Sequence, residues 1–565
     1  MEHDGGNTEL FTAYPGRPLE RLGDGGVNSI SHFSVTVHNW DPSNSDQAVQ
    51  LITSSIRNST CLQHINIFFA SRLRSVFSHR LAALVMDAAA ANANSASVSV
   101  FLQRLSPVHV RPSLVEMLST PAARLLVQKV KLSPAGGDQV LHPQDIQALG
   151  VALSQLTNLR ELSSWVGDLS MLRYMAEADD PTCHIQDLVV EAESHLEGLA
   201  AFLGSTVAAG LNNLELYMEG RTNLANIATL GQALNDHSAI SNFKVYYSRA
   251  SGAGSTQAFA NFLQQLNRPL ELDLAFDGDE ELPFLTRTTM FQTIQNQRHI
   301  KKLAIDFCME DADGTPLLEA TLREIVSLNE GLWELQYRCD QDGASYNQSH
   351  VQGIAEGLRR RWQRGQDGLR VLCLVIDGPL DYLTPLVDVL LDDTLPPPGA
   401  GQRSVLQKLE LQLSIEDFLA NQDAVFRLIG SHRCPMTAFS LAVRVQNDDD
   451  RLVDARRQFA MVLESNKSLE TVSAVLPTGA SDLAFERSIQ TSVTRNRVAK
   501  IVHRFDTGEL GHEDVGTTLD EVEAVCNEHD FDVKRKDGFS LTVIYSCIKN
   551  SRQRAEIFGR LARIN

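Results

Sequence analysis

The chain has 565 residues, of which 43% are hydrophobic and 21% charged, and its formal net charge is −20. This acidic balance argues against a general nucleic-acid binder, which needs a basic surface. No stretch approaches the roughly 18 apolar residues of a membrane helix, and the first residues lack the basic start and apolar run of a signal peptide. We therefore expect a cytoplasmic protein, with the nucleus as an alternative, that contacts neither nucleic acid nor membrane.

Residues 1–28 contain six glycines and two prolines, which is typical of a flexible N-terminal arm. A repeated pattern then extends over residues 29–505. In the segment 211–219 it shows an apolar residue at Leu211, another three positions later at Leu214, and another two positions after that at Leu216. Sixteen copies follow one another, and their first residues are Ile30, Leu62, Ser95, Val127, Leu159, Ile185, Leu211, Ile240, Pro269, Ile300, Leu332, Leu369, Leu406, Met436, Leu469 and Val498.

The spacing of these copies predicts a repeat protein. From residue 30 to residue 498 there are fifteen steps, a mean period of about 31 residues, within the range of solenoids. Of the 48 pattern positions 44 are apolar, whereas the overall hydrophobic share of 43% would give about 21 by chance.

Each copy reads as a short strand followed by a helix. Alternation such as Leu272-Asp-Leu274 indicates a strand with one buried face. Between copies the spacing becomes helical, as at Ile227, Leu230 and Leu234. One strand and one helix cannot bury their own apolar faces, so neighbouring units must stack, with the strands forming a parallel sheet.

Two of these units, Asn329-Glu-Gly-Leu332-Trp-Glu-Leu335 and Asn466-Lys-Ser-Leu469-Glu-Thr-Val472, resemble divergent ribonuclease-inhibitor-like leucine-rich repeats. The resemblance implies an α/β horseshoe with parallel strands on the concave face, helices on the convex face and about sixteen repeats. It also implies a non-enzymatic scaffold or adaptor that binds proteins. A regulator of a small GTPase, of the GTPase-activating type, and a substrate-selecting subunit of a ubiquitin ligase are alternatives.

The outward-facing strand positions predict where a partner would bind. From about the sixth to the fourteenth copy we read carboxylates at these positions and in the loops that follow, which predicts an acidic concave face and rim for a basic protein partner. Three aromatic residues near this band are candidate interface anchors, and the alternative is that they cover the sheet edge. The alternative for the band itself is a role in solubility alone. The predicted protein-binding residues are Trp165, Glu191, Glu215, Tyr217, Glu219, Tyr246, Glu271, Asp273, Asp277, Asp306, Glu334, Asp340 and Asp377.

No motif of an enzyme or a cofactor site is found. The chain lacks a phosphate-binding loop ending in Gly-Lys-Ser/Thr, a Gly-x-Ser-x-Gly elbow and a His-Glu-x-x-His zinc motif, so we expect no catalytic residue, no cofactor and no metal. The eight cysteines form no Cys-x-x-Cys pair, which favours reduced thiols. A basic run, 359–364, reads either as an exposed helix face or as a nuclear-import signal.

The repeat pattern stops near Arg504. Residues 506–565 are acidic and glycine-containing at first and then return to helical spacing, with Leu541, Ile544 and Ile548 on one stripe. We expect an acidic linker and a helical C-terminal cap over the end of the stack. The oligomeric state stays open.

Overall fold

The computed structural model describes most of the repeat region. The described residues are 10–13, 31–37, 42–69, 76–105, 112–133, 142–218, 222–248, 253–277, 284–308, 315–339, 344–366, 369–376, 381–392, 406–431, 436–444, 451–476 and 483–506. The chain forms two compact units. Unit 1 comprises Met1–Ala275 with Leu282–Thr293, and unit 2 comprises Phe276–Glu281 with Ile294–Asn565.

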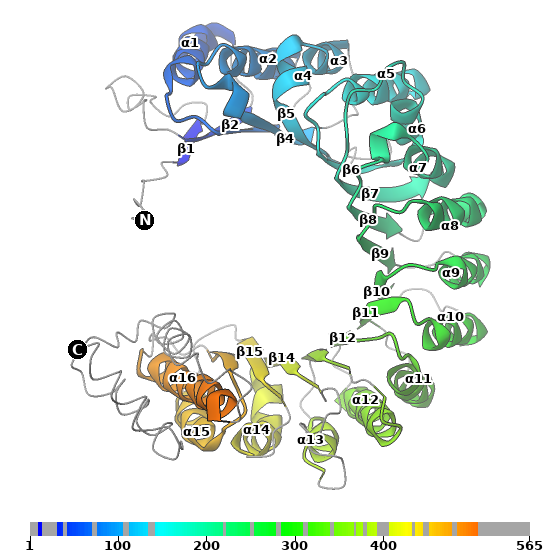
Figure 1. The fold of residues 1–565 in the computed structure, drawn as a ribbon, viewed down its shortest axis with the longest axis vertical. Helices are drawn as coiled ribbons and strands as arrows, with labels where there is room; N and C mark the ends of the chain where they lie inside the picture. The colour runs from blue at the N-terminus through cyan, green and yellow to red at the C-terminus, as the bar shows by residue number, and fades with distance from the viewer. Residues whose placement is uncertain are drawn as a thin grey trace. The chain divides into compact units, whose positions relative to one another are not determined.

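Unit 1 alternates strands with helices along the chain (Figure 1). Its elements are β1 (Leu10–Ala13), β2 (His32–Val37), α1 (Pro42–Asn58), β3 (His64–Phe69), α2 (Val76–Ala90), η3 (Ser95–Ser97), β4 (Ser99–Leu105), α3 (Pro112–Leu118), α4 (Pro121–Leu126), β5 (Val127–Leu132), α5 (Pro143–Ser154), β6 (Glu161–Asp168), α6 (Ser170–Ala176), β7 (Asp187–Ser194), α7 (Leu196–Leu203), η5 (Thr206–Ala208), β8 (Asn213–Met218), η6 (Leu224–Asn226), α8 (Ile227–Asp236), β9 (Asn242–Ser248), α9 (Ala253–Gln265), β10 (Leu270–Asp277) and most of α10 (Phe284–Asn296).

Unit 2 continues the same alternation (Figure 1). Its elements are β11 (Ile300–Cys308), α11 (Thr315–Leu328), β12 (Glu334–Cys339), α12 (Ala344–Gln363), β13 (Val371–Ile376), α13 (Thr384–Leu390), β14 (Lys408–Ser414), α14 (Ile415–Gly430), β15 (Ala438–Arg444), α15 (Arg451–Ser465), β16 (Thr471–Val475) and α16 (Leu483–Asp506).

Within each unit the strands lie side by side in chain order, and all pairs are parallel. Equivalent repeat positions face one another: Leu214 of β8 pairs with Phe243 of β9 and with Leu188 of β7. In unit 2, Leu335 of β12 pairs likewise with Leu372 of β13. This register follows from burial, because a slip of one residue would turn every buried side chain of a strand to the other face.

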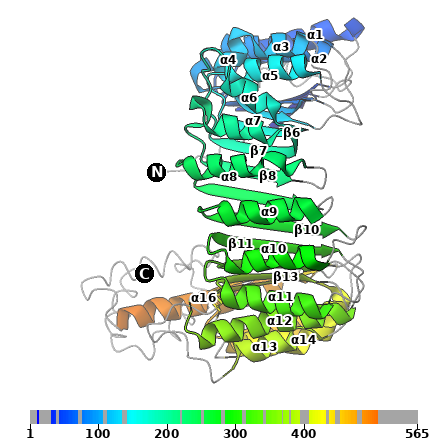
Figure 2. The ribbon, with the colours of Figure 1, turned by 90° about the vertical axis from the view of Figure 1, so that its right-hand side faces the viewer.

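In each unit the helices lie on one face of the sheet (Figures 1 and 2). The strands bury the side chains that point toward these helices, as at Leu214, Leu216 and Met218, whereas Asn213, Glu215 and Tyr217 on the other side are only half-buried. We call this second side the open face. It presents the residues two, four and six positions after each pattern start.

The expected α/β repeat architecture is confirmed, with about fifteen repeats, because fifteen of the sixteen copies contain a strand. The sixteenth copy is wrong, since its first residue, Val498, lies inside helix α16. The predicted starts of the third and ninth copies lie two residues away from the positions that the strand register gives them. Ser95 belongs to η3, and Val100 takes the position opposite Ile65.

Buried amides join successive repeats at the position three residues before the pattern start. Asn329 donates through Nδ2 to the carbonyl of Ile294, at 2.9 Å, and its Oδ1 accepts from the backbone of Gly331 and Leu332. Asn466 donates in the same way to the carbonyl of Ile429, at 2.7 Å. Each amide thereby joins a carbonyl near the end of the preceding helix to the turn before its own strand.

The ends of the chain add two observations. Strand β1 lies within residues 1–28 and pairs in parallel with β2. The expected C-terminal linker and cap lie outside the described residues, except for Asp506, which ends α16. Among the described helices, none combines the length and apolarity needed to cross a membrane.

Candidate functional site

Three aromatic rings stack on the open face of unit 1. The centroid of the Trp165 ring, from β6, lies 4.7 Å from that of Tyr217 on β8, with 50° between the planes. Tyr217 stacks in turn on Tyr246 of β9, with centroids 4.0 Å apart and 10° between the planes. Aromatic pairs of this kind contribute about 0.5–1.5 kcal/mol beyond the area they bury.

The sheet places these rings by two different means. Tyr217 and Tyr246 face each other directly in the register of β8 and β9. Trp165 comes from two strands away, at an irregularity where β6 loses its regular register with β7 between Ser164 and Gly167. Gly167, at the end of this irregularity, has φ +77, a left-handed conformation that glycine adopts without strain.

The polar atoms of the stack are partly shielded from water. The hydroxyl of Tyr217 donates to Oε2 of Glu215 at 3.2 Å. The pKa of Tyr217 is raised far above its ordinary value, first by burial and then by its contact with Tyr246. The indole N–H of Trp165 is buried and finds no acceptor within the described part of the chain. A buried donor without an acceptor costs about 1–3 kcal/mol. The packing of Trp165 against its neighbours therefore has to offset this cost.

Carboxylates flank the rings on the adjoining strands. Glu191 of β7 lies opposite Tyr217, and Asp273 of β10 lies opposite Tyr246 in the strand register. Glu271 and Asp273 on β10, with Glu191 and Glu215, are half-buried. We call Trp165, Tyr217, Tyr246, Glu191, Glu215, Glu271 and Asp273 together the aromatic–acidic patch.

Among the described residues one cation enters this region, and it was not predicted from the sequence. Lys244 on β9 lies opposite Glu271, and its Nζ is 4.2 Å from the centroid of the Tyr246 ring. With four carboxylates and one ammonium group, the patch and Lys244 carry a formal charge of −4 + 1 = −3. A lysine or arginine side chain of a partner could therefore contact a carboxylate and a ring face of the patch at the same time.

The remaining predicted residues lie elsewhere. Asp306 on β11 and Glu334 on β12 belong to unit 2. Asp277 ends β10, and its side chain is outside the described part of the structure. Glu219, Asp340 and Asp377 lie outside the described residues, as does most of the expected acidic rim.

In the described strands of unit 2, basic side chains lie beside the carboxylates of the predicted acidic band. There Lys302 of β11 lies 3.8 Å from Glu334, and Lys408 of β14 forms an ion pair with Glu410. Arg338 on β12 faces Asp306 in the register. Basic side chains therefore occupy outward positions beside the carboxylates of these strands and offset their charge.

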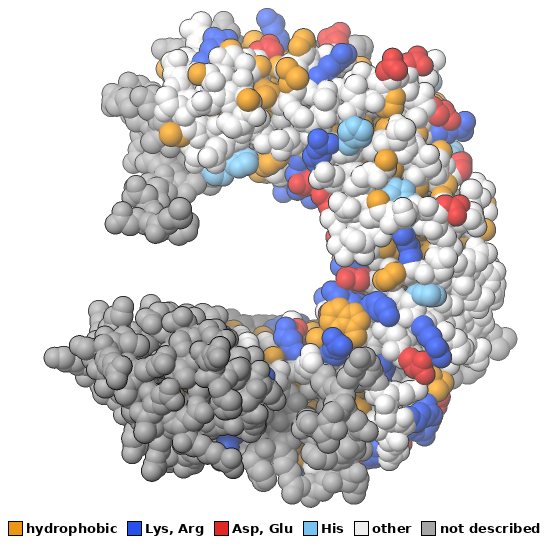
Figure 3. All heavy atoms as spheres, viewed as in Figure 1, with side chains coloured by type: hydrophobic (Ala, Val, Ile, Leu, Met, Phe, Trp, Pro, Cys, Tyr) orange, Lys and Arg blue, Asp and Glu red, His pale blue; other side chains and the backbone are white. Residues whose placement is uncertain are grey.

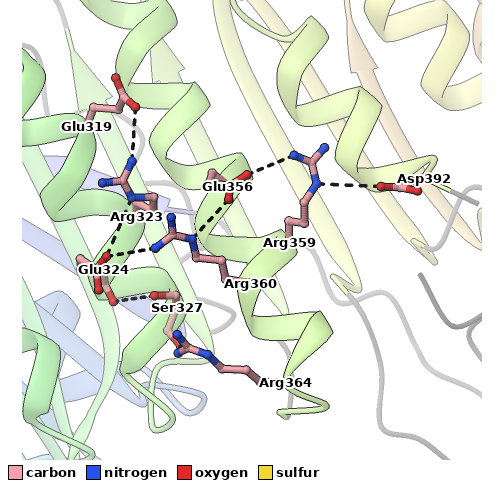
Figure 4. Close-up of polar contacts among 9 residues, drawn as sticks. All are labelled: Glu319, Arg323, Glu324, Ser327, Glu356, Arg359, Arg360, Arg364 and Asp392. Carbon is pink, nitrogen blue, oxygen red and sulfur yellow. Dashed lines mark hydrogen bonds and ion pairs between the residues drawn. The ribbon is translucent and has the colours of Figure 1, made fainter. Parts of the chain in front are cut away.

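The basic run of α12 is part of the structure rather than a free cationic surface (Figure 4). Arg360 lies 3.2 Å from Glu324 of α11 and 3.3 Å from Glu356, and Arg359 lies 3.1 Å from Glu356. Arg364 donates to the backbone carbonyl of Ser327. The arginines thus tie α12 to α11 and to their own helix.

Arg361, in the same run, is the largest fully buried side chain among the described residues. Its guanidinium donates to the carbonyls of Val326, Asn329, Glu330 and Leu332, at 2.9–3.3 Å. These carbonyls belong to the end of α11 and the turn that follows, so the charge also compensates the helix dipole there.

A second group of rings, also not predicted, lies on the open face near the start of unit 1. The ring centroids of His32 and His64 are 4.7 Å apart, and that of Phe101 is 5.6 Å from His64. Burial, and to a lesser degree the neighbouring His32, lowers the pKa of His64. No group of three metal-binding side chains occurs in the described part of the chain.

Comparison with known proteins identifies no relative: no protein-family model matches the chain, and no curated protein matches it either.

Proposed function

We propose that the chain is a non-enzymatic scaffold or adaptor whose aromatic–acidic patch holds a protein partner with a basic surface. The observation that carries this proposal is the three-ring stack of Trp165, Tyr217 and Tyr246, set half-exposed among carboxylates of β7, β8 and β10. Large, stiff rings beside charge are favoured anchors of protein interfaces.

The chemistry of the patch defines the partner further. Lysine or arginine side chains gain from the carboxylates at the rim and can lie over exposed ring faces, as Lys244 already does over Tyr246. A net negative field speeds the approach of a basic surface and weakens at high salt. We therefore expect an arginine- or lysine-rich segment with capture that depends on ionic strength.

A charge-reversal experiment tests the proposal. The wild-type protein, the patch variant Glu215→Lys/Glu271→Lys/Asp273→Lys and a control variant Asp87→Lys/Glu116→Lys/Asp179→Lys are used to capture partners from native extract at low and high salt. The control residues are exposed and lie outside the patch, and both variants change the net charge equally. We expect the patch variant alone to lose the partners that salt releases. Equal capture by all three proteins would refute the proposal.

We further propose that the repeats are divergent ribonuclease-inhibitor-like leucine-rich repeats. One strand and one helix per unit, and buried amides such as Asn329 and Asn466 before the strand, support this proposal. A cytoplasmic location is likewise proposed. It is supported by the free thiols of Cys183 and Cys373, which lie buried and unbridged.

A further inference from the structure

Unit 2 carries a basic group at the amino-terminal edge of its sheet, separate from the acidic surface of unit 1. Trp333 stands in the turn just before β12, half-exposed. Lys301 at the start of β11 and Arg370 just before β13 occupy the same repeat position on the neighbouring strands. Where β11 and β12 lie in Figure 1, Figure 3 shows Lys and Arg side chains around hydrophobic ones.

Backbone hydrogen bonds fix this arrangement. The N–H of Trp333 donates to the carbonyl of Lys301 at 3.0 Å, and the N–H of Arg370 donates to the carbonyl of Trp333 at 2.7 Å. Gly331 permits the close packing of the turns, because a Cβ there would lie 1.9 Å from the carbonyl oxygen of Arg298. With a strand spacing of about 4.8 Å, the Lys301 and Arg370 backbones stand roughly 10 Å apart on either side of Trp333.

Two further cations border the ring, and each has a carboxylate. Nζ of Lys302 lies 5.4 Å from the centroid of the Trp333 ring and 3.8 Å from Glu334. Arg298 lies 3.0 Å from Glu330. We call Arg298, Lys301, Lys302, Trp333 and Arg370 the Trp333 edge.

Lys301 and Arg370 differ from these two cations. Neither forms an ion pair with any residue in the described part of the chain, and Lys301 donates only to the carbonyl of Arg298, at 3.3 Å. Arg370 is exposed. In a chain with a net charge of −20, two cations without a carboxylate partner on either side of a half-exposed indole form an uncommon surface.

We propose that the Trp333 edge binds an acidic segment of a partner protein, with one carboxylate near Lys301, another near Arg370 and an apolar side chain against Trp333 between them. An extended peptide rises about 3.3 Å per residue, so acidic residues about three positions apart match the separation of the two cations. Arg370 can also hold its carboxylate with two parallel hydrogen bonds. This proposal does not depend on the aromatic–acidic patch.

The surroundings favour a protein segment over a nucleic acid. Glu330 and Glu334 lie within the edge, where they would repel a continuous phosphate backbone but leave room for discrete carboxylates beside Lys301 and Arg370. The overall charge also opposes the long-range attraction on which nucleic-acid binding depends.

Fluorescence anisotropy with the full-length chain tests this proposal. The probe is a short fluorescein-labelled peptide of Asp and Glu with Leu at its centre, compared with a Lys-rich peptide and an oligouridine RNA of matched length. The variants are Lys301→Glu/Arg370→Glu, Trp333→Ala and the control Lys467→Glu/Arg487→Glu, whose residues are exposed in the same unit. Thermal unfolding of each variant shows whether it is folded.

We expect saturable binding of the acidic peptide that weakens about tenfold in Lys301→Glu/Arg370→Glu and decreases in Trp333→Ala, while the control variant binds as the wild type does. Absence of saturable binding of the acidic peptide to the wild type, or equal binding by every folded variant, would overturn the proposal. Tighter binding of the RNA, lost in Lys301→Glu/Arg370→Glu, would overturn it in favour of a nucleic-acid surface.

Discussion

Tyr217 and Tyr246 stack face to face across two neighbouring parallel strands, with ring centroids 4.0 Å apart. The stack predicts energetic coupling. In a double-mutant cycle with Tyr217→Ala and Tyr246→Ala, we expect a coupling energy of about 0.5–1.5 kcal/mol in the free energy of unfolding, measured by urea denaturation. Tyr217→Phe is the matched control, since it keeps the ring and removes the hydroxyl that donates to Glu215. Strictly additive effects of the two alanine substitutions would show that the rings merely lie near each other.

Arg361 is predicted to be essential for the stability of unit 2. Arg361→Met keeps much of the side-chain volume but removes four hydrogen bonds to backbone carbonyls, three of them buried, so we expect a loss of about 3–5 kcal/mol. The neighbouring Arg359→Met removes partly exposed ion pairs and should cost about 1 kcal/mol or less. Thermal and urea unfolding of the two variants compares these losses. Similar losses for both would contradict a special role for Arg361.

Stability should fall in acid because of His350. A hydrogen bond of 2.5 Å joins its Nδ1 to the Tyr337 hydroxyl, and burial lowers the pKa of His350 from 6.5 to about 4. Between these values the unfolded chain binds a proton that the folded chain does not, so the free energy of unfolding decreases as pH falls. From pH 7 to pH 4 this effect amounts to about 3 kcal/mol.

The variant His350→Gln isolates this contribution, because glutamine does not titrate. We expect its unfolding free energy, measured by urea denaturation across the same pH range, to decrease less steeply than that of the wild type. Parallel curves for the two proteins would show that His350 does not contribute.

The cysteines are predicted to differ sharply in reactivity. Burial raises the pKa of Cys183 and of Cys373 to about 12, whereas Cys61 is exposed. At pH 8 a thiol with that pKa is a thiolate in only about one molecule in ten thousand, and burial also blocks the reagent. Mass spectrometry after brief treatment with iodoacetamide should find Cys61 modified and the other two unmodified until the protein is denatured. Early modification of Cys183 or Cys373 in the folded protein would contradict the buried positions.

Much of the repeat architecture follows from sequence because strands and helices have different periods. The alternation in Leu214-Glu-Leu216 and the helical spacing of Ile227, Leu230 and Leu234 each occur where the structure has β8 and α8. The error at Val498 has the same origin, since apolar residues three positions apart also lie on one face of a helix. A shift of two residues, as in the third copy, preserves which side chains are buried, so apolarity alone does not detect it.

The candidate surfaces were less predictable because they depend on neighbours that are distant in the sequence. Glu334 is acidic in isolation, but the register places Lys302 beside it, 32 positions away in the chain. Trp165, which contacts Tyr217, lies where β6 loses its regular register with β7, and an irregularity of this kind has no clear signature in the residue pattern. The repeat pattern assigns Lys244 and Trp333 to defined positions in their copies. Their neighbours, however, could be predicted only from the alignment of the adjoining strands.

Because each strand in a unit pairs only with the strands before and after it in the chain, every repeat forms most of its interactions with sequence neighbours. The gain or loss of one whole repeat during evolution would then alter only the junction where it occurs. The length of such a protein can change in steps of one repeat, while a group of side chains assembled by three or four adjacent repeats passes unchanged from ancestor to descendant.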